Sequence, residues 1–191
     1  MYYDPNMYRY PQSNYPVAPM YYPNVNQSVY WTYPNDMVQA NSYGYVNLPN
    51  NQRVTLNDHG KKPYVVNINQ AAKQNNNYRT AIWTGRHLQV TLMSINVGED
   101  IGLEVHPTTD QFLRIEEGQG IVRMGDRKDR LDFEERVFDD FAIMVPAGKW
   151  HNVINTGNKP LKLYSIYGPP NHPFGTVNKT KAEEMHHHRS F

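Results

Sequence analysis

The chain has 191 residues, a formal net charge of +1 at pH 7 and no cysteine. This length predicts one domain with additional segments. The small net charge gives no electrostatic reason to expect a nucleic acid as partner. The lack of cysteine excludes disulfides, thiolate zinc sites and cysteine nucleophiles. No apolar run approaches the ~18 residues of a membrane span, and the N-terminus lacks the pattern of a secretory signal. We therefore expect a cytoplasmic protein with no membrane contact.

Residues 1–58 differ in composition from the rest of the chain. Eleven of the fifteen tyrosines lie before Val46, mixed with proline and asparagine, whereas Leu and Ile are nearly absent there. Such a segment buries too little aliphatic surface to offset the entropy of ordering, which predicts a disordered tail. It is either an extension without a task or a segment whose phenols bind partners or cross-link. Tyr-rich tails of this sort resemble those of bacterial spore-coat proteins, which gives the spore coat as alternative location and coat-layer proteins as partners.

Residues 59–178 alternate between short apolar segments and turn signals, and no window has a long helical period. The predicted strands are approximately 64–68, 79–84, 88–96, 102–106, 111–117, 120–124, 131–138, 142–146, 151–156 and 161–167. A turn or short helical segment is predicted over 69–74, and another short helix over 180–184 in a C-terminal tail of residues 179–191. Many short strands at even spacing favour an all-β antiparallel sandwich or barrel.

Two stretches carry polar residues at regular positions. The first, G-E-D-I-G-L-E-V-H-P-T-T-D-Q-F-L-R-I-E-E-G, covers 98–118, and the second, P-A-G-K-W-H-N-V-I-N, covers 146–155. Glu104 and His106 alternate, so on a strand both side chains point to the same face. Pro146 and Gly148 predict a turn that places His151 at the start of another strand. Two hairpin-like units would thus direct donor atoms to one side.

These stretches resemble the two signature motifs of the cupin superfamily, G-x5-H-x-H-x3,4-E-x6-G and G-x5-P-x-G-x2-H-x3-N. The spacing matches throughout, with three departures: Glu104 stands at the first His, Gln111 at the Glu, and Asp140 at a Gly. The resemblance, closest to small single-domain cupins of the mannose-6-phosphate-isomerase-like type, implies a single antiparallel jelly-roll β-barrel. It also implies a homodimer, because cupin barrels commonly pair through sheet edges.

The resemblance implies that Glu104, His106, Gln111 and His151 are the metal ligands. Two imidazoles and one carboxylate are kept, although the carboxylate has moved. This set suits Fe or Mn best, and Zn or Ni are also allowed. An amide is a weak ligand, so Gln111 either binds the metal or lies beside its ligands. Glu104 is also the candidate catalytic residue, as a general base. A metal-free polar pocket is the alternative.

The implied reactions are those of cupin isomerases, decarboxylases and dioxygenases, acting on a small molecule such as a sugar or an organic acid. A non-catalytic binding module and a structural coat protein are the alternatives, so enzymatic activity is left open. A sugar-phosphate isomerase would need basic residues at the pocket, for which only Arg79, Arg114 and Lys149 are candidates. Of these, Arg114 alternates away from the inward face.

The remaining expectations concern structural residues. The side chains predicted to point inward are Leu113, Ile115, Met144 and Val153, with Met93 and Trp83 nearby. Gly148 and Asn155 are predicted to serve turns, the first with a positive φ. His87 and His172 are interpreted as ordinary polar residues, with the alternative that His172 reaches the mouth of the barrel. The three histidines at 186–188 are not counted as a site.

Overall fold

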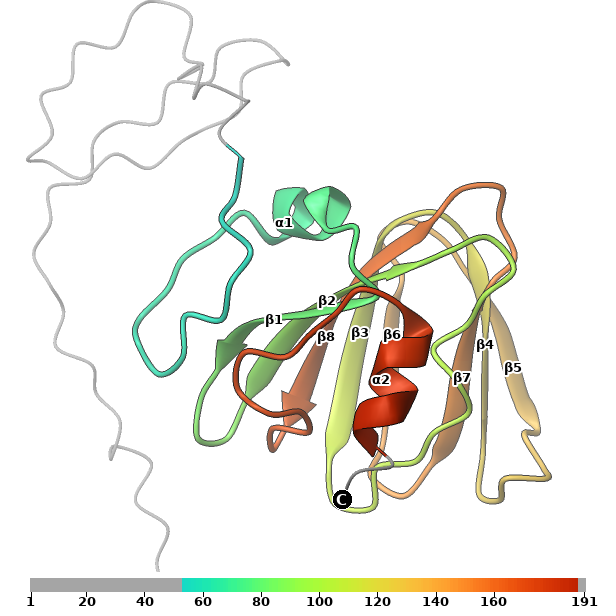
Figure 1. The fold of residues 1–191 in the computed structure, drawn as a ribbon. Helices are drawn as coiled ribbons and strands as arrows, with labels where there is room; N and C mark the ends of the chain where they lie inside the picture. The colour runs from blue at the N-terminus through green and yellow to red at the C-terminus, as the bar shows by residue number, and fades with distance from the viewer. Residues whose placement is uncertain (1–52, 189–191) are drawn as a thin grey trace, which may run out of the picture. The chain divides into compact units, whose positions relative to one another are not determined.

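The structure, a computed structural model, describes residues 53–188, with side chains described to residue 185 (Figure 1). Residues 1–52 of the predicted disordered tail, which was expected over 1–58, therefore lie outside the described residues. The strands are β1 (Arg79–Thr84), β2 (Gln89–Ile95), β3 (Asp110–Glu117), β4 (Gly120–Gly125), β5 (Phe133–Val137), β6 (Ala142–Val145), β7 (Trp150–Asn155), β8 (Leu161–Gly168) and β9 (Val177–Asn178). The helices are α1 (Ile68–Gln74) and α2 (Lys181–His188).

Two antiparallel sheets form the framework. The six-stranded sheet has the order β6-β3-β8-β2-β1-β9, and the three-stranded sheet has the order β5-β4-β7. Every pairing between these strands is antiparallel. This arrangement confirms the all-β jelly-roll prediction. Neither helix in the described part of the chain is long and apolar enough to cross a membrane.

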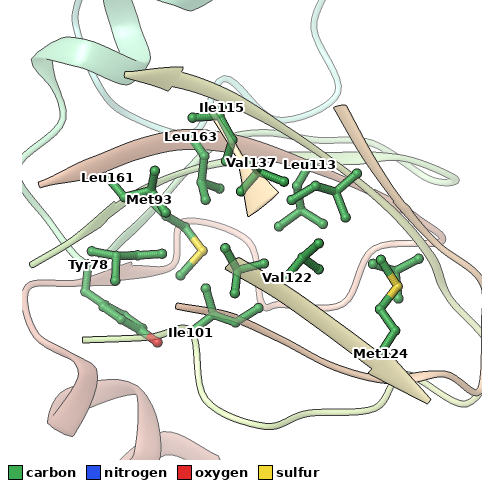
Figure 2. Packing of buried hydrophobic residues seen from close by; sticks show 14 residues of the cluster. Tyr78, Met93, Ile101, Leu113, Ile115, Val122, Met124, Val137, Leu161 and Leu163 are labelled. Atoms are coloured by element: carbon green, nitrogen blue, oxygen red, sulfur yellow. The ribbon is translucent and has the colours of Figure 1, made fainter. Parts of the chain in front are cut away.

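The core lies between the two sheets, as Figure 2 shows. Along β3 the side chains of Leu113 and Ile115 are fully buried, and Met93 and Val153 meet them from β2 and β7. These four residues were predicted to point inward, and the structure confirms them. The alternation of inward and outward side chains along each strand is what produces this single apolar layer.

Two residues predicted near the core lie elsewhere. Met144 is 65% exposed, because β6 places its neighbours Ile143 and Val145 inward instead. Trp83 is displaced by a β-bulge, since the register of β1 against β2 shifts between Ala81 and Trp83. Its indole nitrogen donates a 2.8 Å hydrogen bond to the carbonyl of Lys62, outside the core. Bulges change which face a side chain occupies, and nothing local in the sequence announces this one.

Helix α1 replaces part of the strand predicted over 64–68. Asn67 is its N-cap, and the Asn67 side chain accepts a 3.1 Å hydrogen bond from the Gln70 backbone nitrogen. Such a cap starts a helix at the next residue, so the β-branched residues before it do not form a strand. Ala71 and Ala72 pack with Ile82 and Leu92 in a second apolar cluster.

The strand predicted over 102–106 is also absent. Only Glu104 makes a β-bridge there, with His151, and Gly102 has a φ of 83° that an extended strand does not allow. The strand predicted over 131–138 is the shorter β5. The other predicted strands are confirmed with small differences at their ends. The helix predicted over 180–184 is confirmed as the start of α2, while β9 was not predicted.

The inward and outward positions can be tested by truncation. Leu113→Ala should lower the free energy of unfolding by about 2–5 kcal/mol, because it leaves a cavity in the core. Met144→Ala, on the neighbouring strand β6, should lower it by less than about 1 kcal/mol, because that side chain is exposed. Urea unfolding of both variants measures the difference. Equal losses would contradict the assignment of faces.

Candidate metal centre

A backbone pairing between Glu104 and His151 sets the centre of the site. The Glu104 nitrogen donates to the His151 carbonyl at 3.0 Å, and the His151 nitrogen donates to the Glu104 carbonyl at 2.9 Å. Residues that exchange both bonds stand directly opposite each other, and their side chains leave the same face of the ladder. The carboxylate and the imidazole are therefore neighbours, although 47 positions separate them in the chain.

The turn before β7 holds His106. The Gly148 nitrogen donates to the His106 carbonyl at 2.8 Å, and the Ala147 nitrogen donates to the Asp110 side chain at 2.8 Å. Gly148 has a φ of 81°, a conformation that residues with a side chain rarely adopt. The predicted positive φ at Gly148 is thus confirmed. The turn ties the loop that carries His106 to the strand that carries His151.

Three donor atoms converge at this point. The Nε2 atom of His106 lies 3.4 Å from Oε1 of Glu104, and Nε2 of His151 lies 3.3 Å from the same oxygen. The three ligand atoms all lie within 4.8 Å of one another. His151 is fully buried, and His106 is buried as well. Three of the four ligands that the resemblance implied, Glu104, His106 and His151, are therefore brought together.

The orientation of the His151 imidazole leaves a nitrogen lone pair inside the cluster. Nδ1 of His151 lies 3.0 Å from the carbonyl oxygen of Lys149 and, facing an acceptor, carries the hydrogen. Its Nε2 is then the atom with a free electron pair. Within residues 53–188, neither Nε2 of His151, Nε2 of His106 nor Oε1 of Glu104 has a hydrogen-bond partner. Buried polar atoms are normally satisfied, so three orphans facing one point call for a ligand.

The charge of Glu104 is stabilised by its surroundings. Burial by itself would raise the pKa of this carboxyl, but it is outweighed by the two adjacent imidazoles, which donate to the carboxylate whenever their Nε2 carries a proton, and by the positive charge of Arg79. The pKa of Glu104 is therefore held well below its usual range. A carboxylate that stays ionised while buried is a suitable partner for a cation.

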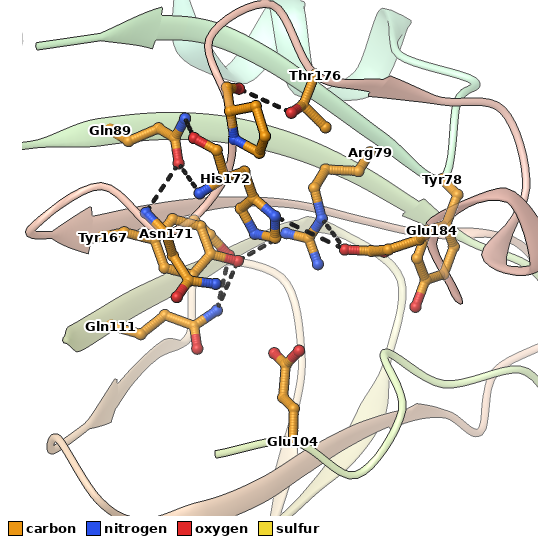
Figure 3. Close-up of polar contacts among 12 residues, drawn as sticks. Tyr78, Arg79, Gln89, Glu104, Gln111, Tyr167, Asn171, His172, Thr176 and Glu184 are labelled. Atoms are coloured by element: carbon orange, nitrogen blue, oxygen red, sulfur yellow. Dashed lines mark hydrogen bonds and ion pairs between the residues drawn. The ribbon is translucent and has the colours of Figure 1, made fainter. Parts of the chain in front are cut away.

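Gln111 on β3 is the fourth predicted ligand. Its amide nitrogen donates to Oγ of Ser165 at 3.3 Å and to the Tyr167 hydroxyl at 3.1 Å. Its Oε1 is buried without a hydrogen-bond partner among the residues that the structure describes. Figure 3 shows the amide nitrogen turned toward Tyr167 and the oxygen turned away from it. Gln111 therefore presents an oxygen and not a nitrogen as its unpaired atom.

A second buried polar group, the Arg79 cluster, consists of Arg79, Tyr167, His172 and Glu184. Arg79 is fully buried on β1, and it donates from Nη1 to the Tyr167 hydroxyl at 2.6 Å and from Nε to Glu184 at 2.7 Å. Burial raises the pKa of Tyr167 to about 12, so its hydroxyl stays neutral at pH 7. The edge of the Tyr167 ring meets His106, with ring centroids 5.7 Å apart.

Sequence reasoning named Arg79 as a basic candidate at the pocket and His172 as an alternative, but it missed Tyr167 and Glu184. On β8, Ser165 and Tyr167 lie two and four residues after the buried Leu163, so their side chains share its face. The sequence alternation therefore could have identified both as inward-facing. His172 is buried with its ring centroid 5.0 Å from that of Tyr167, which favours the alternative that this residue reaches the mouth of the barrel. No local pattern pointed to Glu184.

The other two basic candidates are paired at the surface. Arg114 donates to Asp140 at 2.6 Å and also to Glu116, and Lys149 pairs with Asp126. Asp140 and Asp126 are largely exposed. The outward direction predicted for Arg114 agrees with this pairing.

Comparison with known proteins agrees with the fold and with the motifs. A protein-family model described as a cupin domain matches residues 91–167. The uncharacterized protein YrkC of Bacillus subtilis is 61% identical over 187 residues, which cover 97% of this chain and 98% of YrkC. The chain belongs to the cupin family. The mannose-6-phosphate-isomerase-like type remains a prediction.

Two further relatives of this cupin extend the comparison. The uncharacterized protein L612 of Acanthamoeba polyphaga mimivirus is 42% identical over 121 residues, covering 63% of this chain and 74% of L612. The crystal structure of BH2720 from Bacillus halodurans has 67% sequence identity and a TM-score of 0.68, and it covers 68% of this chain and 98% of BH2720. The likeness to BH2720 thus supports the barrel that carries the site.

The role of Tyr167 can be measured through stability. Tyr167→Phe should lower the free energy of unfolding by about 1–3 kcal/mol, because Arg79 and Gln111 each lose a buried acceptor. Tyr164→Phe is the matched control on the same strand, since Tyr164 is only partly buried, and it should cost less than about 1 kcal/mol. Chemical denaturation of both variants tests this. A Tyr167→Phe protein as stable as the control would refute the hydrogen-bond assignment.

Proposed function

We propose that this cupin binds one divalent transition metal ion through Glu104, His106 and His151 and uses it to act on a small organic acid. One observation carries the proposal: three buried donor atoms, two of them imidazole Nε2 and one a carboxylate oxygen, face one another without hydrogen-bond partners inside the described part of the chain. An ion placed among them would satisfy all three at once.

The distances from Glu104 to the two imidazoles fit such an ion. Two atoms that bind the same metal at about 2.1 Å each are at most about 4.2 Å apart. The contacts from Glu104 Oε1 to the two imidazoles are 3.4 Å and 3.3 Å, within this limit. The bond of His151 Nδ1 to the Lys149 carbonyl is the outer interaction that fixes the tautomer of a metal-binding imidazole.

The donor set favours Fe(II) or Mn(II), with zinc and nickel as alternatives. Two imidazoles and one carboxylate that leave positions free are characteristic of non-haem iron sites. Gln111 would offer its unpaired oxygen as a further, weaker donor, and Tyr167 and Ser165 hold it in that orientation. When bound, the metal would polarise a substrate oxygen or serve as a redox centre.

Among the reactions that the family resemblance allows, decarboxylation or oxygenation of an organic acid is favoured over isomerisation of a phosphorylated sugar. A phosphate group needs several cations at the pocket. Arg114 and Lys149 are engaged with Asp140 and Asp126 at the surface. Of the three basic candidates only Arg79 is buried beside the metal centre, where it pairs with Glu184, and one guanidinium suits one carboxylate. Glu104, held ionised, provides negative charge next to the reacting atoms.

Metal content tests this function. Purified without an affinity tag and reconstituted with Fe(II) or Mn(II), the protein should hold about one ion per chain by elemental analysis. Glu104→Ala and His151→Ala should lose most of it, because each removes one of three ligands. His87→Ala, an exposed histidine, should retain the metal, and so should a variant with alanine at 186–188. Equal metal content in all four variants would place the ion elsewhere and contradict the proposal.

The second candidate function is assembly into a spore coat or a similar layer, which the concentration of tyrosine before Val46 favours. In this case the homodimer expected from the sheet edges would be the unit that is assembled. Deletion of residues 1–52 separates the candidates. A metal-dependent enzyme should keep its turnover and its metal without these residues, whereas a layer protein should lose its incorporation into the coat fraction. Incorporation that survives the deletion would remove the second candidate.

A further inference from the structure

Helix α2 is attached to the barrel by charge and not by apolar burial. Among its described side chains, Lys181 to Met185, only Glu184 is buried, and Met185 is 50% exposed. Lys181 forms an ion pair with Asp100 at the start of the helix. Surface helices usually bury an apolar stripe, which stabilises them far more than exposed ion pairs do. Among the described side chains of α2, the contacts with the barrel are therefore the ion pairs of Glu184 and Lys181.

The Glu184 carboxylate occupies a position built for an anion. It lies 2.7 Å from Nε of Arg79 and 3.9 Å from Nδ1 of His172. Arg79 is completely buried. Its Nη1 donates to the Tyr167 hydroxyl, and its Nε donates to the Glu184 carboxylate. A buried guanidinium requires a negative partner, and in this chain the partner comes from a helix at the end of the sequence, 105 residues away.

This position adjoins the candidate metal centre. The Tyr167 hydroxyl accepts hydrogen bonds from both Arg79 and Gln111, so a single atom connects the two groups. Figure 3 shows the carboxylate of Glu104 directed toward the side on which Gln111 and the Arg79–Glu184 pair lie. A small acid whose carboxylate replaced that of Glu184 would be held next to the metal ligands.

We propose that Arg79 binds the carboxylate of a small organic acid and that Glu184 fills this subsite as an internal carboxylate, which the acid displaces together with helix α2. The proposal deepens the proposed function. It rests on that function only where the acid is said to reach the metal, and binding of the carboxylate to Arg79 does not require the metal. Exchange is restricted to anions. Loss of Glu184 without a replacement would leave a buried, unpaired guanidinium, which is strongly unfavourable. A neutral molecule of the same shape cannot compensate for that loss.

Competition with an internal carboxylate gives the first test. Propionate binding to the full-length protein, treated with EDTA, is measured by isothermal titration calorimetry, with propionamide as the neutral probe. Glu184→Gln should bind propionate at least about tenfold more tightly than the wild type. The Glu184 carboxylate is a tethered competitor at millimolar or higher effective concentration, and the substitution removes its charge and so weakens its hold on Arg79. Glu183→Gln, which changes the neighbouring exposed carboxylate, should bind like the wild type. Equal propionate affinity in Glu184→Gln and Glu183→Gln would overturn the proposal.

A second measurement does not depend on altering the subsite. Hydrogen exchange of the backbone amides in residues 181–188 should become faster when propionate is added to the wild type and should not change with propionamide. Lys181→Ala removes the other ion pair of α2 and should strengthen propionate binding, although it leaves Arg79 and Glu184 intact. Exchange that stays the same or slows with propionate would overturn the proposal.

Two measurements, Mn(II) uptake by the wild type and propionate affinity of the EDTA-treated variants, separate this proposal from the proposed function. If the wild type takes up no Mn(II) but Glu184→Gln still gains propionate affinity, the carboxylate subsite stands and the metal function fails. If Mn(II) binds at about one ion per chain but Glu184→Gln gains no affinity, the metal function stands and the subsite is refuted.

Discussion

The double backbone hydrogen bond between Glu104 and His151 is the constraint on which the site depends. It fixes which residue of the loop before β3 stands opposite which residue of β7. Further bonds along the same path hold the loop in place, from the Ile101 nitrogen to the Val153 carbonyl and from the Asn155 nitrogen to the Glu99 carbonyl. A shift of one residue would turn the side chain of Glu104 to the other face and remove the carboxylate from the cluster.

The inward face of the six-stranded sheet is divided along its strands. In the register of β3 against β8, Ile115 pairs with Leu163 at the apolar end, and Gln111 pairs with Tyr167 at the polar end. The apolar end is part of the core in Figure 2, and Gln111 and Tyr167 at the polar end are among the residues of Figure 3. The same strand thus contributes to the core and to the candidate site, because its apolar half anchors the backbone that positions its polar half. The same division explains how buried polar groups are tolerated here, since most find partners across the sheet.

The spacing of short strands predicted an antiparallel sandwich or barrel, and the resemblance to the cupin motifs narrowed this to a jelly-roll and implied that Glu104, His106 and His151 meet. The period of a strand gave the correct faces along β3 and β7, and the turn at Gly148 was readable because it requires a residue that tolerates positive φ. Glu104 and His106 lie outside the strands, and backbone hydrogen bonds to His151 and Gly148 place them. Asp140, which departs from the motif glycine, adopts a φ of 70° and so keeps the backbone conformation of that position. Its carboxylate accepts a hydrogen bond from Arg114.

The errors have equally specific causes. Trp83 was assigned to the wrong place because of the bulge in β1. Met144 was assigned inward because the alternation along the short strand β6 was counted one residue out of step. The segment before Ile68 was predicted as a strand because the N-cap Asn67 was overlooked. The contact of Arg79 with Glu184 joins the first strand to the last helix, and it arises only from tertiary packing. A period within one strand carries no information about a side chain that arrives from another part of the fold. The polar group behind the metal centre was therefore largely invisible in the sequence.

Anomalous diffraction from crystals grown with Mn(II) tests the central claim most directly. The account predicts one strong peak in contact with Nε2 of His106, Nε2 of His151 and a carboxylate oxygen of Glu104. A map with no peak among these three residues, or with the ion bound only at another position of the chain, would contradict it.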